Sequence, residues 1–155
     1  YIFHILWRCI MSWLKIFALS TIAGLSFCFI FSVRPRNMIV CALFSGMTWT
    51  SLQYLQSLGV NSVFATLISG FLLGIGTEIA AVKLKSPAIN FIIIGFIPLV
   101  PGLKTYQGIL NLIQGNQNAG VALLFEASFI AVAIAVSIMV SSSLARAFRL
   151  KVKKK

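Results

Sequence analysis

The sequence alternates between long apolar blocks and short polar segments. An α-helix needs roughly 20 apolar residues to cross the hydrocarbon core of a membrane, and the blocks are about that long. The pattern therefore predicts an all-α integral membrane bundle with about five transmembrane helices. The predicted spans are Trp13–Val33, Met38–Leu58, Val63–Val82, Ala88–Ile113 and Val121–Leu144.

Composition supports the same class of protein. Charged residues make up 10% of the chain and hydrophobic residues 59%, whereas a soluble domain carries about 25% charged residues. We expect residues 1–155 to form a single transmembrane domain. Within it, residues 1–12 fit either an interfacial helix or the lead-in to the first span, and residues 146–155 form a basic cytoplasmic tail.

The fourth span is interrupted by a Pro-x-x-Pro-Gly segment formed by Pro98, Pro101 and Gly102. Each proline lacks a backbone N–H and clashes with the preceding helical turn, so the helix is expected to break. The residues directly after the break are Lys104, Thr105, Tyr106 and Gln107. A proline kink can serve packing alone. A broken helix followed by polar side chains is more typical of a transport site, so we interpret this segment, with Lys104, Tyr106 and Gln107, as part of a substrate path.

The freed backbone groups at such a break have opposite chemical preferences. Carbonyls before the break can bind cations or ammonium groups, and N–H groups after it, together with Lys104, suit a carboxylate. An amino acid or an organic acid fits that arrangement. The second span is also unusually polar, because Thr48, Thr50, Ser51, Gln53 and Gln56 lie in its second half. This helix is expected either to be buried among others or to line a polar path.

Basic residues are distributed asymmetrically between the loops. The loops at 34–36 and 83–85 and the tail from Arg146 carry two, two and six of the 13 basic residues, whereas the loops at 59–62 and 114–119 carry none. With five spans, the basic segments fall on one side of the membrane. The positive-inside rule then places the C-terminus in the cytoplasm and the N-terminus outside, in the cytoplasmic membrane. The net charge of +11 is thus explained by membrane orientation rather than by binding of nucleic acid.

The chain has two acidic residues, Glu78 and Glu126, and both lie inside predicted spans. Carboxylates within a membrane are costly and therefore candidates for function, here charge coupling. Glu78 lies about five residues before Lys83, so a structural pairing with Lys83 or Lys85 is an alternative. Lys104 and Glu126 lie at similar heights in the outer half of the bundle, and we expect them to pair. The competing interpretation is that Lys104 extends to the outer surface.

Motifs for other chemistries are not apparent. The sequence has no Walker-type nucleotide loop, no zinc-ligand spacing and no serine or cysteine triad. Its three cysteines are spread over separate apolar segments, which is typical of small residues in helix packing. We therefore expect no enzymatic activity, no cofactor and no metal.

The segments Ser86-Pro87-Ala88, Ile97-Pro98-Leu99-Val100-Pro101-Gly102 and Tyr106-Gln107-Gly108, with the stretch Phe31–Gly46, resemble the threonine/serine exporter family in its small-subunit form. The resemblance implies secondary export of small amino acids by this chain together with a larger membrane subunit. Some split members are associated with dicarboxylate export, so succinate-like substrates stay open. A different alternative is a scaffold that assembles the larger subunit without itself carrying substrate.

Overall fold

The computed structural model describes the backbone of residues 2–152 and the side chains of residues 13–147. Regular structure within this range is entirely helical, which confirms the all-α prediction. The elements are α1 (Ile2–Ile30), α2 (Pro35–Ser57), α3 (Ser62–Lys83), α4 (Ala88–Phe96), the short 3₁₀ turn η1 (Ile97–Leu99), α5 (Gly102–Ile113) and α6 (Gln117–Val152).

The number of membrane spans agrees with the sequence pattern. Four stretches are long and apolar enough to cross a membrane, namely Trp13–Ile30, Pro35–Ser57, Ser62–Lys83 and Gln117–Ala147. The bent pair formed by Ala88–Leu99 and Gly102–Ile113 corresponds to the span predicted to be broken, and it makes five spans when it is counted as one. The chain is therefore a multi-pass membrane protein. The backbone of residues 2–12 continues α1.

Small residues set the main helix contacts. On α3, Gly70 and Gly74 lie against Ser137 and Ser141 of α6, so closely that a methyl group on either glycine would overlap the facing serine. Gly24 of α1 meets α2 in the same way. Association in lipid depends on such close approach, because there is no water to drive apolar surfaces together. Gly70 and Gly74, which are four residues apart on α3, therefore form part of the α3–α6 interface.

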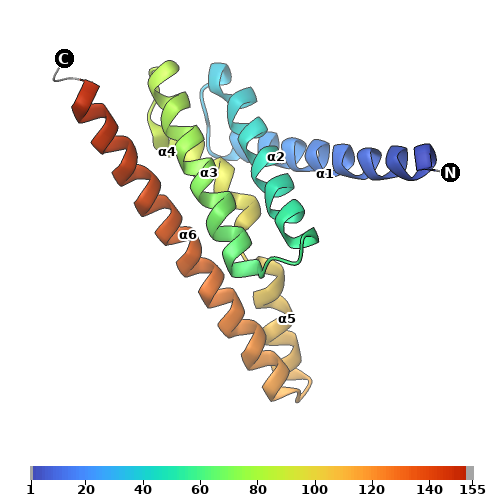
Figure 1. Cartoon of the computed structure of the whole chain (residues 1–155). Coiled ribbons are helices and arrows are strands. Elements are labelled where there is room, and N and C mark those ends of the chain that lie inside the picture. Colours follow the sequence, from blue (N-terminus) through green and yellow to red (C-terminus); the bar gives the residue numbers. More distant parts are fainter. Residues whose placement is uncertain (1, 153–155) are drawn as a thin grey trace.

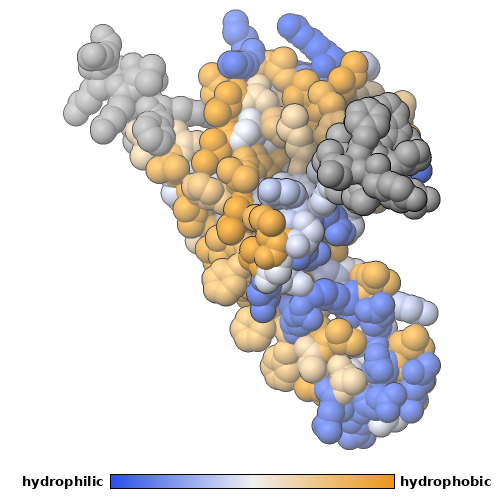
Figure 2. All heavy atoms as spheres, turned by 45° about the vertical axis from the view of Figure 1, so that its right-hand side comes forward, coloured by the Kyte–Doolittle hydropathy of each residue, from blue (hydrophilic) through white to orange (hydrophobic). Residues whose placement is uncertain are grey.

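The helices are not equal in length or direction (Figure 1). α2, α3, α4 and α6 run side by side, whereas α1 lies across them. The hairpin made by α5 and the beginning of α6 extends past the turn between α2 and α3. This α5–α6 hairpin is closed by a tight contact between Gly108 and Gly120. Figure 2 shows that hydrophilic residues gather at this lower end, whereas apolar residues dominate the upper body.

The predicted alternation of basic and uncharged loops is visible in the fold. The α1–α2 and α3–α4 loops and the C-terminal part of α6 lie at one end of the bundle, and the α2–α3 and α5–α6 turns lie toward the other (Figure 1). The two basic loops are tied together by Asn37, whose buried amide donates a hydrogen bond to Ser86 Oγ at 2.8 Å. Side chains of the tail from residue 148 onward lie outside the described residues.

Candidate functional site

The break in the fourth span is a short, well-anchored turn. α4 ends at Phe96, η1 contains Pro98, and α5 begins at Gly102 after a bend of 41°. Leu99 is 3% exposed and packs in a core cluster with Leu52 and Ala65, near the end of α2 and the beginning of α3. The break therefore has a fixed position in the core, close to the α2–α3 turn.

Some of the backbone groups at the break are engaged within the chain. The Pro101 carbonyl accepts hydrogen bonds from both the amide and the hydroxyl of Thr105, at 3.0 and 2.9 Å. The Gly102 N–H donates to the Val100 carbonyl at 2.8 Å. Local bonds therefore engage these two groups, and the binding of substrate by other freed backbone groups of the break stays a prediction.

Lys104 forms an ion pair with Glu126, as the sequence predicted. Lys104 lies in the first turn of α5 and Glu126 on α6, and their side chains are 29% and 37% exposed. The Lys104 ammonium group also donates a hydrogen bond to Ser62 Oγ at 3.0 Å. The alternative in which Lys104 extends alone to the outer surface is wrong, because its charge is held by two partners from other helices.

The ion pair connects α5 with α6, and the hydrogen bond to Ser62 adds α3. All three helices therefore meet near the α2–α3 turn. Ser62 is the first residue of α3, so the pair lies level with the α2–α3 turn. Sequence reasoning missed Ser62. The available signal was its position directly after the N-cap residue Asn61, at the same end of the bundle as Lys104. We call Ser62, Lys104 and Glu126 the charged cluster.

The other residues predicted for the substrate path are placed differently. Tyr106 is 63% exposed and lies two positions after Lys104, which puts it on the opposite side of α5. The two side chains therefore leave α5 on different faces, and the role of Tyr106 in the substrate path stays a prediction. Gln107 is also exposed, but it lies three positions after Lys104, on nearly the same face. Pro98, Pro101 and Gly102 shape the bend that directs Lys104 toward α6.

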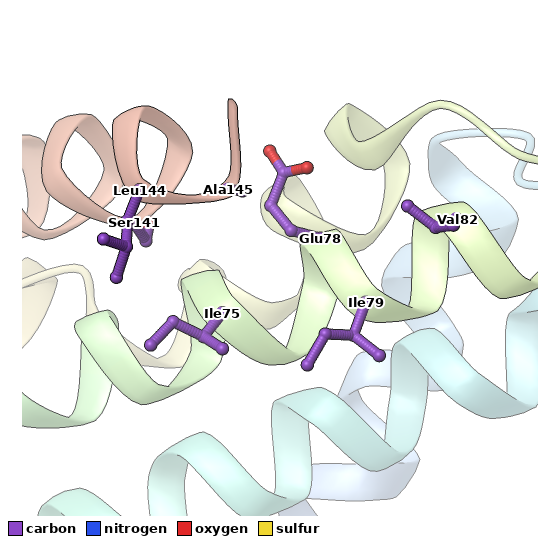
Figure 3. Close-up of a pocket in the computed structure, with 7 residues that line it drawn as sticks. All are labelled: Ile75, Glu78, Ile79, Val82, Ser141, Leu144 and Ala145. Carbon is purple, nitrogen blue, oxygen red and sulfur yellow. The ribbon is translucent and has the colours of Figure 1, made fainter. Parts of the chain in front are cut away.

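Glu78 lies far from the charged cluster. It is 16 residues after Ser62 on α3, or about 24 Å of helix rise. Figure 3 shows its side chain rising from α3 on the side where α6 lies. The pocket there has a volume of about 370 Å³ and, apart from Glu78 and Ser141, is lined by apolar side chains from α3 and α6. The two carboxylates therefore do not form one site, and a pairing of Glu78 with Lys83 or Lys85 stays a prediction.

Metal chemistry has no support in the geometry. In the range whose side chains are described, no three His, Cys, Asp or Glu residues come together as a metal site. Cys28 and Cys41 are fully buried in the core between α1 and α2. Their thiols point to the carbonyls of Met38 and Asn90, at 3.7 and 3.8 Å. They act as small core residues.

Comparison with known proteins adds the family context. A family model described as "Threonine/Serine exporter, ThrE" matches residues 16–144. A relative from Haemophilus influenzae (strain ATCC 51907 / DSM 11121 / KW20 / Rd), described as an uncharacterized protein, is 24% identical over 96 residues. That match covers 61% of this chain and 32% of the relative, so it spans about a third of the relative's length. No solved structure matches the chain.

Proposed function

The chain belongs to the threonine/serine exporter family, and from this premise we propose that it is a subunit of a secondary exporter of threonine- and serine-like amino acids. The family is one of transporters, which agrees with the absence of catalytic motifs from the sequence. The main support for the proposal is the charged cluster, which lies directly after the break in the fourth span. It is a charged site in an otherwise apolar bundle, and intramembrane charges typically mark substrate or ion pathways.

The ion pair is chemically complementary to a zwitterion. The carboxylate of an amino acid can replace Glu126 as the partner of Lys104, while its ammonium group pairs with Glu126. Each charge of the pair then keeps an opposite charge beside it, so opening the pair does not leave a charge uncompensated. A dicarboxylate would place a second negative group against Glu126. The cluster therefore favours amino acids over succinate-like substrates.

The proposed transporter includes a larger membrane subunit of the same family. The α5–α6 hairpin supports this arrangement, because Leu103, Ile113 and Phe125 are exposed along it and its tip extends past the α2–α3 turn. In this proposal the hairpin and the charged cluster face a path shared with the larger subunit. The scaffold alternative differs in one respect: the complex would assemble, and threonine would leave the cell, without any need for the charges of Lys104 and Glu126.

We propose that the protein lies in the cytoplasmic membrane with the basic loops inside. Single cysteines at Asn116 and Lys83 test this orientation, since both side chains are exposed at opposite ends of the bundle. In intact cells, a membrane-impermeant maleimide should label Asn116→Cys and should label Lys83→Cys only after the membrane is permeabilised. The reverse pattern would overturn the orientation and leave the fold unchanged.

Threonine efflux tests the function itself. Cells in which the chromosomal gene is deleted are loaded with threonine and compared with unaltered cells, so that any partner subunit stays at its natural level. We expect the deletion to reduce the initial rate of threonine efflux and to raise internal threonine, and the restored gene to reverse both. Equal efflux in the two strains, with the protein present in the unaltered membrane, would contradict the proposal.

A further inference from the structure

One face of α5 is apolar and exposed along its whole length. Its members recur at i, i+3, i+6, i+7 and i+10, and they are Leu103, Tyr106, Ile109, Leu110 and Ile113. Their side chains are 38–78% exposed. α5 packs on α6 through its other side, where Gly108 comes close to Gly120. We call the five exposed residues the α5 apolar face.

The α5 apolar face begins at the level where α3 ends. α3 has 22 residues, or about 33 Å of rise, which already exceeds the roughly 30 Å of the hydrocarbon core. Its first residue, Ser62, contacts Lys104 in the first turn of α5. Ile113 lies nine residues further along α5, or about 14 Å, and the hairpin extends past the α2–α3 turn (Figure 1). The far end of the face therefore lies in the headgroup region or in the water beyond it.

α6 places the boundary of the hydrocarbon core at the same level. Glu126, the ion-pair partner of Lys104, lies 20 residues before Arg146 near the basic end of α6, or about 30 Å. Exposed amides of Gln107 and Gln114 border the face, and hydrophilic residues gather at this end of the molecule (Figure 2). Amides find no hydrogen-bond partner among lipid tails, so lipid tails do not cover this region. An apolar patch rimmed by polar residues then indicates contact with another protein.

The surroundings of the face define the chemistry of that protein. No charged residue occurs between Lys104 and Glu126 in the sequence, so the complementary surface is apolar and uncharged. The spacing of three and four residues suits a second helix packed lengthwise. Five side chains are far fewer than the 20–30 residues per side of a stable interface between free proteins. The partner is therefore a membrane protein that is also held beside this chain by other contacts.

Charge favours a different chain over a second copy as the partner. The net charge of +11 is concentrated in loops and a tail at one end of the bundle, so two adjacent copies would bring these like charges together. The stretch shared with the relative from Haemophilus influenzae is 32% of that relative, so further sequence accompanies the matching unit there. A larger membrane subunit would supply such additional sequence here.

We propose that the larger subunit docks on the α5 apolar face through an apolar helix at the outer side of the membrane, an inference that rests on the proposed function and orientation. The contact places this helix beside the first turn of α5, which carries Lys104. The charged cluster then borders the junction between the two subunits, where a shared substrate path would run.

The test compares two neighbouring positions near the tip of α5, in cells that carry each variant in the chromosomal gene. Ile113→Glu places a charge on the α5 apolar face. Gln114→Glu is the matched control, because it adds the same charge at the same end of the helix, but on the amide side. Ile113→Leu is the conservative variant. The tagged chain is extracted in mild detergent. The co-purified larger subunit, identified by mass spectrometry as a second membrane protein of the exporter family, is quantified per tagged chain.

We expect Ile113→Glu to lower the amount of co-purified larger subunit at least tenfold, because it places a charge in an apolar contact. Gln114→Glu and Ile113→Leu should keep most of it. Purified Ile113→Glu alone should unfold at the temperature of the unaltered chain, since Ile113 is 78% exposed.

Three results would overturn the docking surface. One is equal co-purification with Ile113→Glu and Gln114→Glu. The second is the absence of any second family protein from the unaltered preparation. The third is capture of an untagged copy of this chain instead, sensitive to Ile113→Glu. Threonine efflux measured with and without the gene decides the exporter proposal separately, so the two failures are distinguishable.

Discussion

Reversing either charge of the Lys104–Glu126 pair is expected to lower both the amount of folded protein and the rate of export. Lys104→Glu places two carboxylates side by side, and Glu126→Lys places two ammonium groups there. Since the pair is about one third exposed, we expect a loss of about 1–3 kcal/mol in stability, between the values for surface and buried pairs. Threonine efflux should fall at least tenfold, because neither variant can hold both ends of a zwitterion.

The double variant Lys104→Glu with Glu126→Lys is the control for this prediction. It restores one charge of each sign and should recover most of the thermal stability of the purified protein. The Ser62 hydroxyl lies beside both positions, so it can donate to a carboxylate at 104 and accept from an ammonium group at 126. A double variant no more stable than the less stable single variant would show that the two charges do not stabilise each other in the membrane.

Replacing Gly74 by serine at the α3–α6 contact is expected to produce the second large effect. Gly74 and Ser141 are both buried, and a side chain on Gly74 would overlap the Ser141 side chain. Gly74→Ser should therefore separate the two helices and cost about 1–3 kcal/mol or more through overpacking. We expect most of the folded protein to be lost from membranes, as measured by detergent extraction and size-exclusion chromatography.

The matched variant carries Gly74→Ser together with Ser141→Gly. It keeps the same atoms at the contact and moves the small residue to the other helix, so most of the folded protein should return. Ser141→Gly alone should cost only about 0.5–1 kcal/mol, the usual cost of glycine within a helix. If Gly74→Ser alone were extracted as a normal folded protein, the close packing of α3 on α6 would be contradicted.

Much of the fold was predictable, because apolar block lengths and loop charges both report on the membrane. The exact ends of the helices were not predictable from the sequence. The last apolar block was expected to end at Leu144, but α6 continues to Val152 because polar and basic residues stop the membrane span without breaking a helix. A different signal ends α5 at Ile113. Gly115 follows with a φ of +85°, a conformation that suits glycine, and the chain reverses there before α6 begins.

The candidate site was predictable in part. A charge deep in an apolar block needs a partner, which was enough to pair Lys104 with Glu126. The sequence did not predict Ser62 as the third member, since that contact depends on how the bend of the fourth span places the first turn of α5 beside the beginning of α3. Tyr106 was predicted because it follows the break among polar residues, in a segment that resembles the family; helix geometry places its side chain opposite Lys104, and its role stays a prediction.

The most direct test of the central claim is threonine efflux from cells that carry Glu126→Gln in place of the natural gene. This change keeps the size of the side chain and one acceptor oxygen for Lys104, and it removes the negative charge. With equal amounts of protein in the membrane, we expect the initial efflux rate to fall at least tenfold, toward that of cells lacking the gene. Efflux equal to that of the unaltered protein would contradict a path through the charged cluster and would favour the scaffold alternative.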